Sequence, residues 1–145
     1  HAGMAGGQAI DLASIGRTLD ETALRDMHRR KTGALLQASV LMGAACGSTD
    51  EAAWQALAAY GDAIGLAFQV VDDILDCTAS TATLGKTAGK DQAADKATYV
   101  SLLGLEPARA YAGELRSEAR EALAVFGGRA TRLIRLADFI CDRKF

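Results

Sequence analysis

The apolar residues of this 145-residue chain recur at intervals of three and four rather than two. Intervals of three and four match the 3.6-residue turn of an α-helix, whereas an interval of two is typical of strands. The chain also contains a single proline, Pro107, so long stretches are free to form helix. The pattern therefore predicts an all-α fold, with Pro107 in the first turn of one helix.

Polar residues and glycines mark where the expected helices begin and end. Asp20 is suited to cap the start of a helix, and Ser48 with Glu51 has the spacing of a capping box. The capping box predicts a helix that starts just before Asp50 and runs to about residue 77. The charge-free residues 32–45 predict a central helix surrounded by protein on most sides. Other helices are expected at residues 2–14, 96–103 and 107–126, with a last amphipathic helix before the basic end.

Length and charge narrow the classes of protein that this chain can represent. Its 145 residues suffice for one domain with a core, and the net charge of −2 offers no basic surface for nucleic acid. Three widely spaced cysteines favour a reducing, cytoplasmic compartment over a disulfide framework. The charge-free run at residues 33–49 is too short and too polar for membrane insertion. The chain begins with His1 rather than Met, and we interpret it as a piece of a longer protein.

Three carboxylates stand in the most apolar stretch of the chain, at Asp72, Asp73 and Asp76, and no Lys or Arg occurs from residue 52 to 85. In a helix, Asp72 and Asp76 share one face and Asp73 flanks it. Like charges four residues apart destabilise a helix by about 0.2–0.5 kcal/mol unless they are neutralised. Mg²⁺ is commonly held by one or two carboxylates together with substrate phosphates, so the cluster predicts a site for a metal-bound diphosphate.

Lysines elsewhere in the chain are candidates for the remaining phosphate charge, namely Lys31, Lys86 and Lys96. A solvated acidic face is the competing interpretation of the aspartates. Two observations favour the metal site: the flanking residues are apolar, and a glycine loop bearing Lys86 follows directly. A second stripe, which includes Gly65 and Gln69 beside the aspartates, consists of small and polar residues that would leave room for a ligand. His28 lies within the basic run HRRK and is expected to be solvated and without a role.

Several motifs in this order resemble those of the trans-prenyl (polyprenyl) diphosphate synthases, and most nearly the bacterial farnesyl diphosphate synthases. The motifs are FQVVDDILD, then LGKTAGKD and DKATY, with KTG and GGQAIDL upstream. The resemblance extends over the whole chain but includes only the second of the family's two aspartate-rich motifs. It implies an isoprenoid synthase-like bundle of antiparallel helices around a central cavity. Residues 1–145 would form the C-terminal portion of that single domain, and hence a partial fold.

The resemblance also implies roles for individual residues. Mg²⁺, or alternatively Mn²⁺, would be bound at the second aspartate-rich motif, and basic residues would bind the allylic diphosphate. The metal site would comprise Asp72, Asp73 and Asp76; the catalytic residues would be Lys31, Thr32, Gln69 and Lys86; and Phe68, Lys96 and Arg143 would also contact substrate. Thr32 and Gln69 would steady a carbocation or assist proton removal, and Phe68 would lie beside the isopentenyl group.

The implied activity is the Mg²⁺-dependent condensation of dimethylallyl or geranyl diphosphate with isopentenyl diphosphate. The expected product is farnesyl diphosphate, made by a cytoplasmic homodimer. Because the first aspartate-rich motif is absent, the 145 residues alone are expected to be inactive. A second hypothesis is a non-catalytic helical partner subunit of a prenyl synthase. A terpene cyclase is a weaker alternative, since such enzymes do not need the KTG and GK motifs.

Overall fold

The computed structural model describes residues 3–84 and 97–143, without the side chains of residues 79–84. Every regular element in these ranges is helical, which confirms the all-α prediction. The elements are α1 (Met4–Ala13), α2 (Glu21–His28), the π-helix η1 (Arg29–Gly33), α3 (Ala34–Ala45), α4 (Glu51–Leu84), α6 (Tyr99–Leu103), α7 (Leu105–Ala122), the 3₁₀ helix η3 (Ala124–Ala130) and α8 (Thr131–Asp142).

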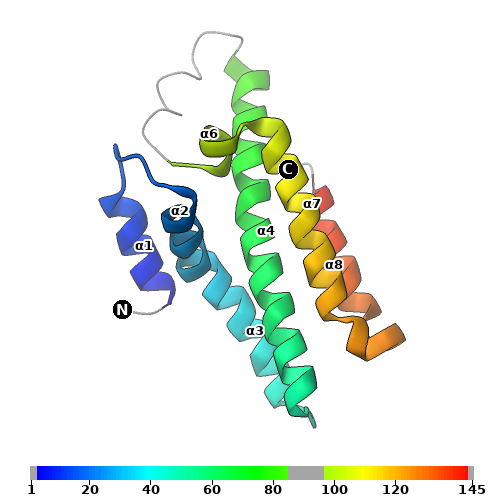
Figure 1. Cartoon of the computed structure of the whole chain (residues 1–145). Coiled ribbons are helices and arrows are strands. Elements are labelled where there is room, and N and C mark those ends of the chain that lie inside the picture. Colours follow the sequence, from blue (N-terminus) through cyan, green and yellow to red (C-terminus); the bar gives the residue numbers. More distant parts are fainter. Residues whose placement is uncertain (1–2, 85–96, 144–145) are drawn as a thin grey trace.

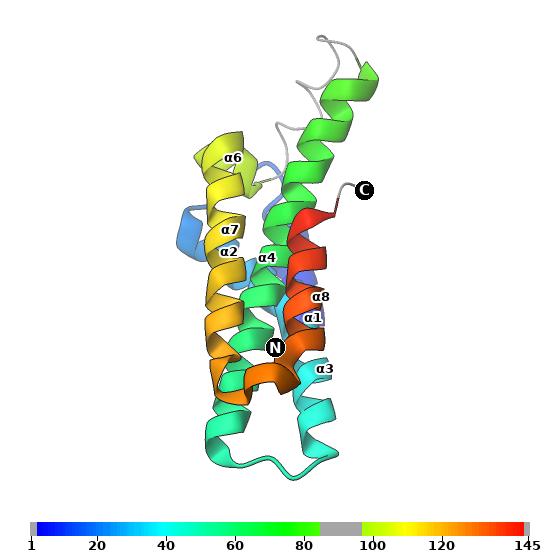
Figure 2. The ribbon, with the colours of Figure 1, turned by 90° about the vertical axis from the view of Figure 1, so that its right-hand side faces the viewer.

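The long helix α4 is the centre of the arrangement (Figure 1). It packs most extensively against α7 on one side and α3 on the other, and α8 lies against both α4 and α7. The chain reverses direction between α3 and α4 and again between α7 and α8, so these four helices form an antiparallel bundle (Figure 2). The antiparallel bundle that the resemblance implied is therefore confirmed. Within the described ranges, no helix combines the length and the apolar character needed to cross a bilayer.

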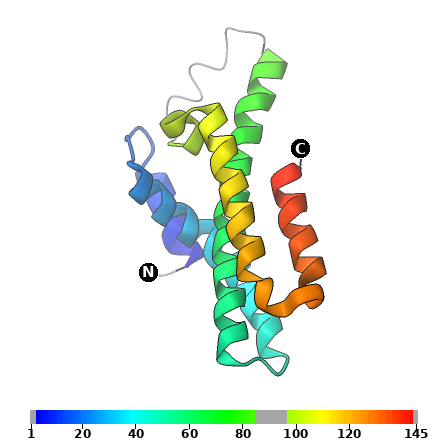
Figure 3. The same ribbon diagram turned by 45° about the vertical axis from the view of Figure 1, so that its right-hand side comes forward.

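Two clusters of buried side chains hold the bundle together. The first joins α4 to α2, α6 and α7 and includes Leu24, Val70, Tyr99 and Leu115. The second joins α4 to α7 and α8, and Tyr60 lies at its centre. The Tyr60 hydroxyl donates a hydrogen bond to the Leu133 carbonyl at 2.8 Å, so it ties α4 directly to α8. Figure 3 shows α7 beside α4, with α8 running back alongside α7 after η3.

The helix starts follow local capping chemistry, with one correction. Asp20 caps α2 by accepting the Ala23 N–H at 2.8 Å, as predicted. The cap of α4 is Asp50, which accepts the Ala53 N–H at 2.8 Å, so the capping box assigned to Ser48 was wrong. Asp50 occupies the N-cap itself and its carboxylate reaches the orphan donor three residues on. Pro107 lies in the first turn of α7, as predicted.

Two helices end at other positions than their patterns predicted. α4 continues to Leu84, one to two turns past the expected end near residue 77, because small residues with no strong helix breaker follow the aspartates. α7 ends at Ala122 instead of Phe126, where the backbone tightens into η3. Gly127 within η3 has φ +52°, a backbone conformation that glycine adopts without steric cost.

The expectation that residues 32–45 form a central buried helix was wrong for the described chain. Leu35 and Met42 are 59% and 63% exposed, and Ala44 is the one buried residue of α3. The helix contacts α4 along a single face. Lack of charge therefore did not indicate burial within this chain, and it left apolar side chains on the opposite face.

Glycines set the spacing between α4 and the helical run before it. A Cβ atom at Gly65 would lie 2.7 Å from the Gly33 Cα, and one at Gly61 would lie 2.9 Å from the Gln37 Cα. Both distances are shorter than ordinary van der Waals contact. Both glycines thus permit close helix packing, and at Gly65 this corrects the expectation that the small residues of the second stripe leave room for a ligand.

Candidate functional site

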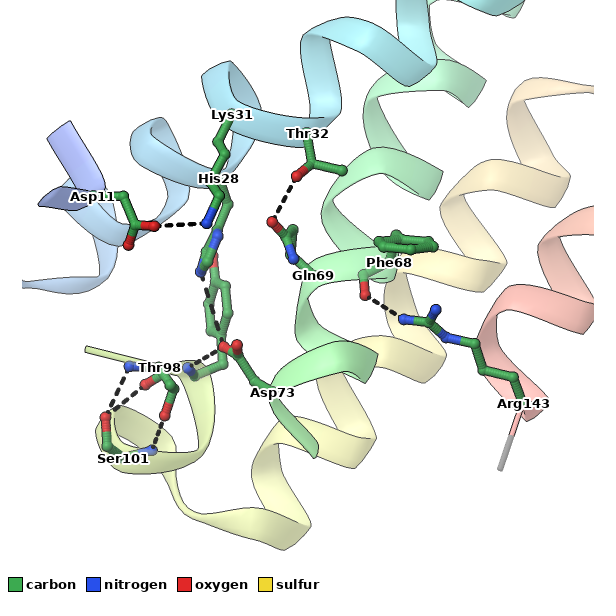
Figure 4. Close-up of polar contacts among 11 residues, drawn as sticks. Asp11, His28, Lys31, Thr32, Phe68, Gln69, Asp73, Thr98, Ser101 and Arg143 are labelled. Atoms are coloured by element: carbon green, nitrogen blue, oxygen red, sulfur yellow. Dashed lines mark hydrogen bonds and ion pairs between the residues drawn. The ribbon is translucent and has the colours of Figure 1, made fainter. Parts of the chain in front are cut away.

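The face of α4 that carries the aspartates lies opposite η1, and two polar side chains meet across the gap. The Thr32 hydroxyl donates a hydrogen bond to the Gln69 Oε1 at 2.7 Å (Figure 4). Gln69 is 7% exposed, so its amide is held in a nearly dry environment. The contact between Gly33 and Gly65 lies one helical turn away and brings the two backbones close enough for this bond. The predicted pair Thr32 and Gln69 is therefore brought together.

Lys31 precedes Thr32 on η1 and forms an ion pair with α1. Its Nζ lies 2.6 Å from the Asp11 Oδ2, and the two side chains are 24% and 10% exposed. Gly7 allows the α1 backbone to approach Lys31, since a Cβ there would collide with the Lys31 main chain. Asp11 was not foreseen as a site residue, although a single carboxylate in the otherwise uncharged segment of residues 2–15 was a usable signal.

Arg143, which directly follows α8, reaches the same region from the other side of α4. Its Nη2 donates to the Phe68 carbonyl at 3.0 Å and to the Asp72 Oδ1 at 3.1 Å. Its guanidinium carbon also lies 4.0 Å from the centroid of the Phe68 ring, a cation–π contact. Arg143 thus contacts two other predicted site residues, Phe68 and Asp72, and Figure 4 shows its approach to Phe68.

Asp73 points away from this group and toward α6 and α2. Its Oδ2 accepts the Tyr99 N–H at 2.8 Å and lies 3.9 Å from the His28 Nε2. His28 is 4% exposed, which contradicts the expectation that it is solvated. Its neighbours in the sequence are charged, but helical geometry directs its ring inward, where it stacks on Tyr99 with 5.7 Å between ring centroids. Burial raises the pKa of the Tyr99 phenol above its ordinary value, with a further rise from Tyr111, so this hydroxyl stays protonated.

The oxygens best suited to a hard metal ion are those of Asp72 and Asp76. The Asp72 side chain is 47% exposed and Asp76 is exposed one turn further along the same face. Two carboxylates with access to water suit Mg²⁺, which retains several waters and takes further oxygens from phosphate. In the described ranges no three His, Cys, Asp or Glu residues converge on a common point. Lys86 and Lys96 lie outside the described residues.

Comparison with known proteins relates this chain to one protein family. A family model described as polyprenyl synthetase matches residues 1–124. The chain is 47% identical over 146 residues to farnesyl diphosphate synthase of Escherichia coli, and 49% identical over 144 residues to a dimethylallyltranstransferase of Fischerella ambigua. Each alignment covers 98% of this chain, but only 49% and 41% of the respective relative.

A solved structure shows the same similarity. The chain matches the geranyltransferase of Helicobacter pylori, complexed with magnesium and isoprenyl diphosphate, with a TM-score of 0.75 and 37% identity. The match covers 95% of this chain and 45% of that structure. The chain therefore spans less than half the length of the relatives that it matches. Because the family model covers well over half of the residues, the chain belongs to the polyprenyl synthetase family.

Proposed function

We propose that this chain is the C-terminal portion of a single all-α prenyl synthase domain and contributes one side of its active site. The observation that carries the proposal is the hydrogen bond between Thr32 on η1 and Gln69 on α4, two closely packed helices that also carry Lys31 and Asp72. The relatives are named farnesyl diphosphate synthase, dimethylallyltranstransferase and geranyltransferase, which supports a prenyltransferase. The reaction that we propose for the whole protein condenses dimethylallyl or geranyl diphosphate with isopentenyl diphosphate, most simply to farnesyl diphosphate.

The residues of this chain suit the binding of a diphosphate and of a metal. Asp72 and Asp76 would hold Mg²⁺, or Mn²⁺, which when bound would act as a Lewis acid on the departing diphosphate. Lys31 has three N–H donors, so it can keep its ion pair with Asp11 and still donate to a phosphate oxygen. The Asp11 carboxylate then fixes the position of the ammonium before substrate arrives.

The proposed bond changes separate into three steps. The allylic C–O bond breaks and its electron pair leaves with the diphosphate, whose growing negative charge Lys31 stabilises. The double bond of isopentenyl diphosphate then attacks the allylic cation and forms the new C–C bond. Loss of a proton restores a double bond, and the Thr32–Gln69 pair, with its oxygens in a dry environment, is placed to stabilise positive charge during these steps.

A second candidate, a helical partner subunit without catalysis, is favoured by exposed apolar side chains. Leu12, Leu35, Met42 and Phe139 are each more than half exposed and lie on α1, α3 and α8. Such surface suits contact with further protein, either the rest of the domain or a second copy in a homodimer. None of the three cysteines, all within the described ranges, forms a disulfide bond, which fits the cytoplasmic location that we propose.

Product formation from labelled isopentenyl diphosphate and geranyl diphosphate, with Mg²⁺, tests the proposal. We expect turnover by the natural protein that carries this sequence and none by residues 1–145 alone. In the natural protein Asp72→Ala should abolish turnover with little change in unfolding temperature, whereas Glu118→Ala, on the exposed face of α7, should leave both unchanged. A natural protein inactive with both substrates would favour the partner subunit, and product from the fragment would refute its inactivity.

A further inference from the structure

We infer that Asp73 is a positioning residue, which joins α6 and α2 to α4, and is not a ligand of the metal. This inference rests on the proposed function in one respect, namely that Asp72 and Asp76 hold the metal. The sequence groups the three carboxylates together, but the structure directs them differently. Asp72 meets Arg143 and Asp76 is exposed, whereas the Asp73 carboxylate is 12% exposed and accepts the Tyr99 N–H.

The hydrogen bond to Tyr99 fixes the start of α6. Thr98 caps this short helix by a reciprocal pair of hydrogen bonds with Ser101, and the Tyr99 N–H is left for a partner outside the helix. The Asp73 side chain on α4 supplies that partner, with 2.8 Å between its Oδ2 and the Tyr99 nitrogen (Figure 4).

The same carboxylate faces a third element. The His28 Nε2 lies 3.9 Å from the Asp73 Oδ2, and the His28 ring stacks on the fully buried Tyr99 ring. Tyr99 in turn packs on Tyr111 of α7 with 5.4 Å between ring centroids. Asp73 thus belongs to a buried junction of α2, α4, α6 and α7.

This junction has a direct consequence for the candidate site. His28 is the last residue of α2, and Lys31 follows it by three residues on η1. Asp73 follows Asp72 on α4. The contacts among His28, Tyr99 and Asp73 fix α2 against α4. They therefore also fix Lys31, the proposed diphosphate ligand, relative to Asp72, the proposed metal ligand. Asp73 would act on the reaction through the positions of these two residues.

Conservative substitution separates a positioning role from metal ligation. Asp73→Asn keeps an oxygen that can accept the Tyr99 N–H, whereas Asp73→Ala removes it. In the natural protein, amide hydrogen exchange at Tyr99 should become about tenfold faster in Asp73→Ala, the expected loss of a hydrogen bond to a charged acceptor. In Asp73→Asn the rate should stay within about threefold of the wild type, because a neutral hydrogen bond remains.

Magnesium binding provides the matched comparison. With inorganic diphosphate as the probe, calorimetry should give a Mg²⁺ dissociation constant that changes by less than about twofold in Asp73→Asn, which keeps an oxygen that accepts the Tyr99 N–H. Asp72→Asn and Asp72→Ala, one residue away, should both weaken it by about tenfold or more. Asp73→Asn that weakens Mg²⁺ binding as much as Asp72→Asn, or Tyr99 exchange unchanged in Asp73→Ala, would overturn the inference. Neither readout requires turnover, so an inactive natural protein would refute the proposed function without deciding this one.

Discussion

Replacing Gly65 by alanine should test whether close contact of α4 with η1 builds the candidate site. A Cβ atom at this position would lie 2.7 Å from the Cα and 3.4 Å from the carbonyl oxygen of Gly33. The two backbones must separate by about 0.7 Å before the shorter distance reaches 3.4 Å, the tight end of ordinary contact. A Cβ and a Cα are both fixed to their main chains, so no change of rotamer relieves the clash.

The size of the effect follows from two opposing terms. Overfilling a packed interior costs about 1–3 kcal/mol, and the rigidity of both atoms places Gly65→Ala in the upper half of that range. Alanine in a helix interior regains about 1 kcal/mol relative to glycine. The free energy of unfolding should therefore fall by about 1–2 kcal/mol. Gly43→Ala, in α3 with no atom within 4 Å of the added Cβ, should instead raise it by about 0.5–1 kcal/mol.

Urea unfolding followed by helical circular dichroism and by fluorescence of the single tryptophan, Trp54, measures both variants. The expected gap between Gly43→Ala and Gly65→Ala is about 1.5–3 kcal/mol. In the natural protein, Gly65→Ala should also lower turnover, because Thr32 and Gln69 flank the displaced contact and share a 2.7 Å hydrogen bond. Equal stabilisation by the two substitutions would refute the close approach of η1 and α4.

Three further substitutions test separate contacts. Tyr60→Phe should lower the free energy of unfolding by about 1 kcal/mol through loss of the bond to the Leu133 carbonyl. Burial raises the Tyr60 pKa to about 12, so the stabilisation by its neutral hydroxyl is complete below pH 10 and is lost toward pH 12. Denaturant titrations at several pH values in that window should show that the free energy of unfolding depends less on pH in the variant than in the wild type. Asp11→Asn should destabilise by about 1–3 kcal/mol, and a double-mutant cycle with Lys31→Met should show coupling. Arg143→Lys should raise the KM for substrate by severalfold in steady-state kinetics, because an ammonium does not reproduce both hydrogen bonds and the ring contact.

The helical class and most helix starts were predictable because they depend on neighbours in the sequence. The spacing of apolar residues determines which face of a helix packs, and the Asp20 cap acts within one turn. The position of Pro107 in the first turn of α7 follows from the same local chemistry. The chemistry of the aspartate cluster was likewise visible from composition alone, since carboxylates without nearby cations need a partner from elsewhere.

The partners of the site residues were not predictable, because they come from distant parts of the chain. Gln69 was expected to be a site residue, but nothing in the sequence indicated that Thr32, 37 residues earlier, would donate to it. His28 was misjudged from its charged neighbours, although its exposure depends on which face of α2 meets α4 and α6. The burial of α3 was misjudged for a similar reason. An uncharged sequence indicates that a helix can be buried, whereas its actual burial depends on the elements that pack against it.

The geometry also explains why η1 and α4 can present several reactive groups in fixed register. Two ties, the contact of Gly33 with Gly65 and the hydrogen bond of Thr32 with Gln69, join two adjacent residues of η1 to residues about one turn apart on α4. Two points fix the relative rotation of a pair of helices, whereas one point would leave it free. Asp72 lies one further turn along α4, so its side chain inherits the orientation set by Gln69. Loosening either tie should therefore disturb the aspartate face as well as the tie itself, and this makes Gly65→Ala a more searching test of the site than removal of any single polar side chain.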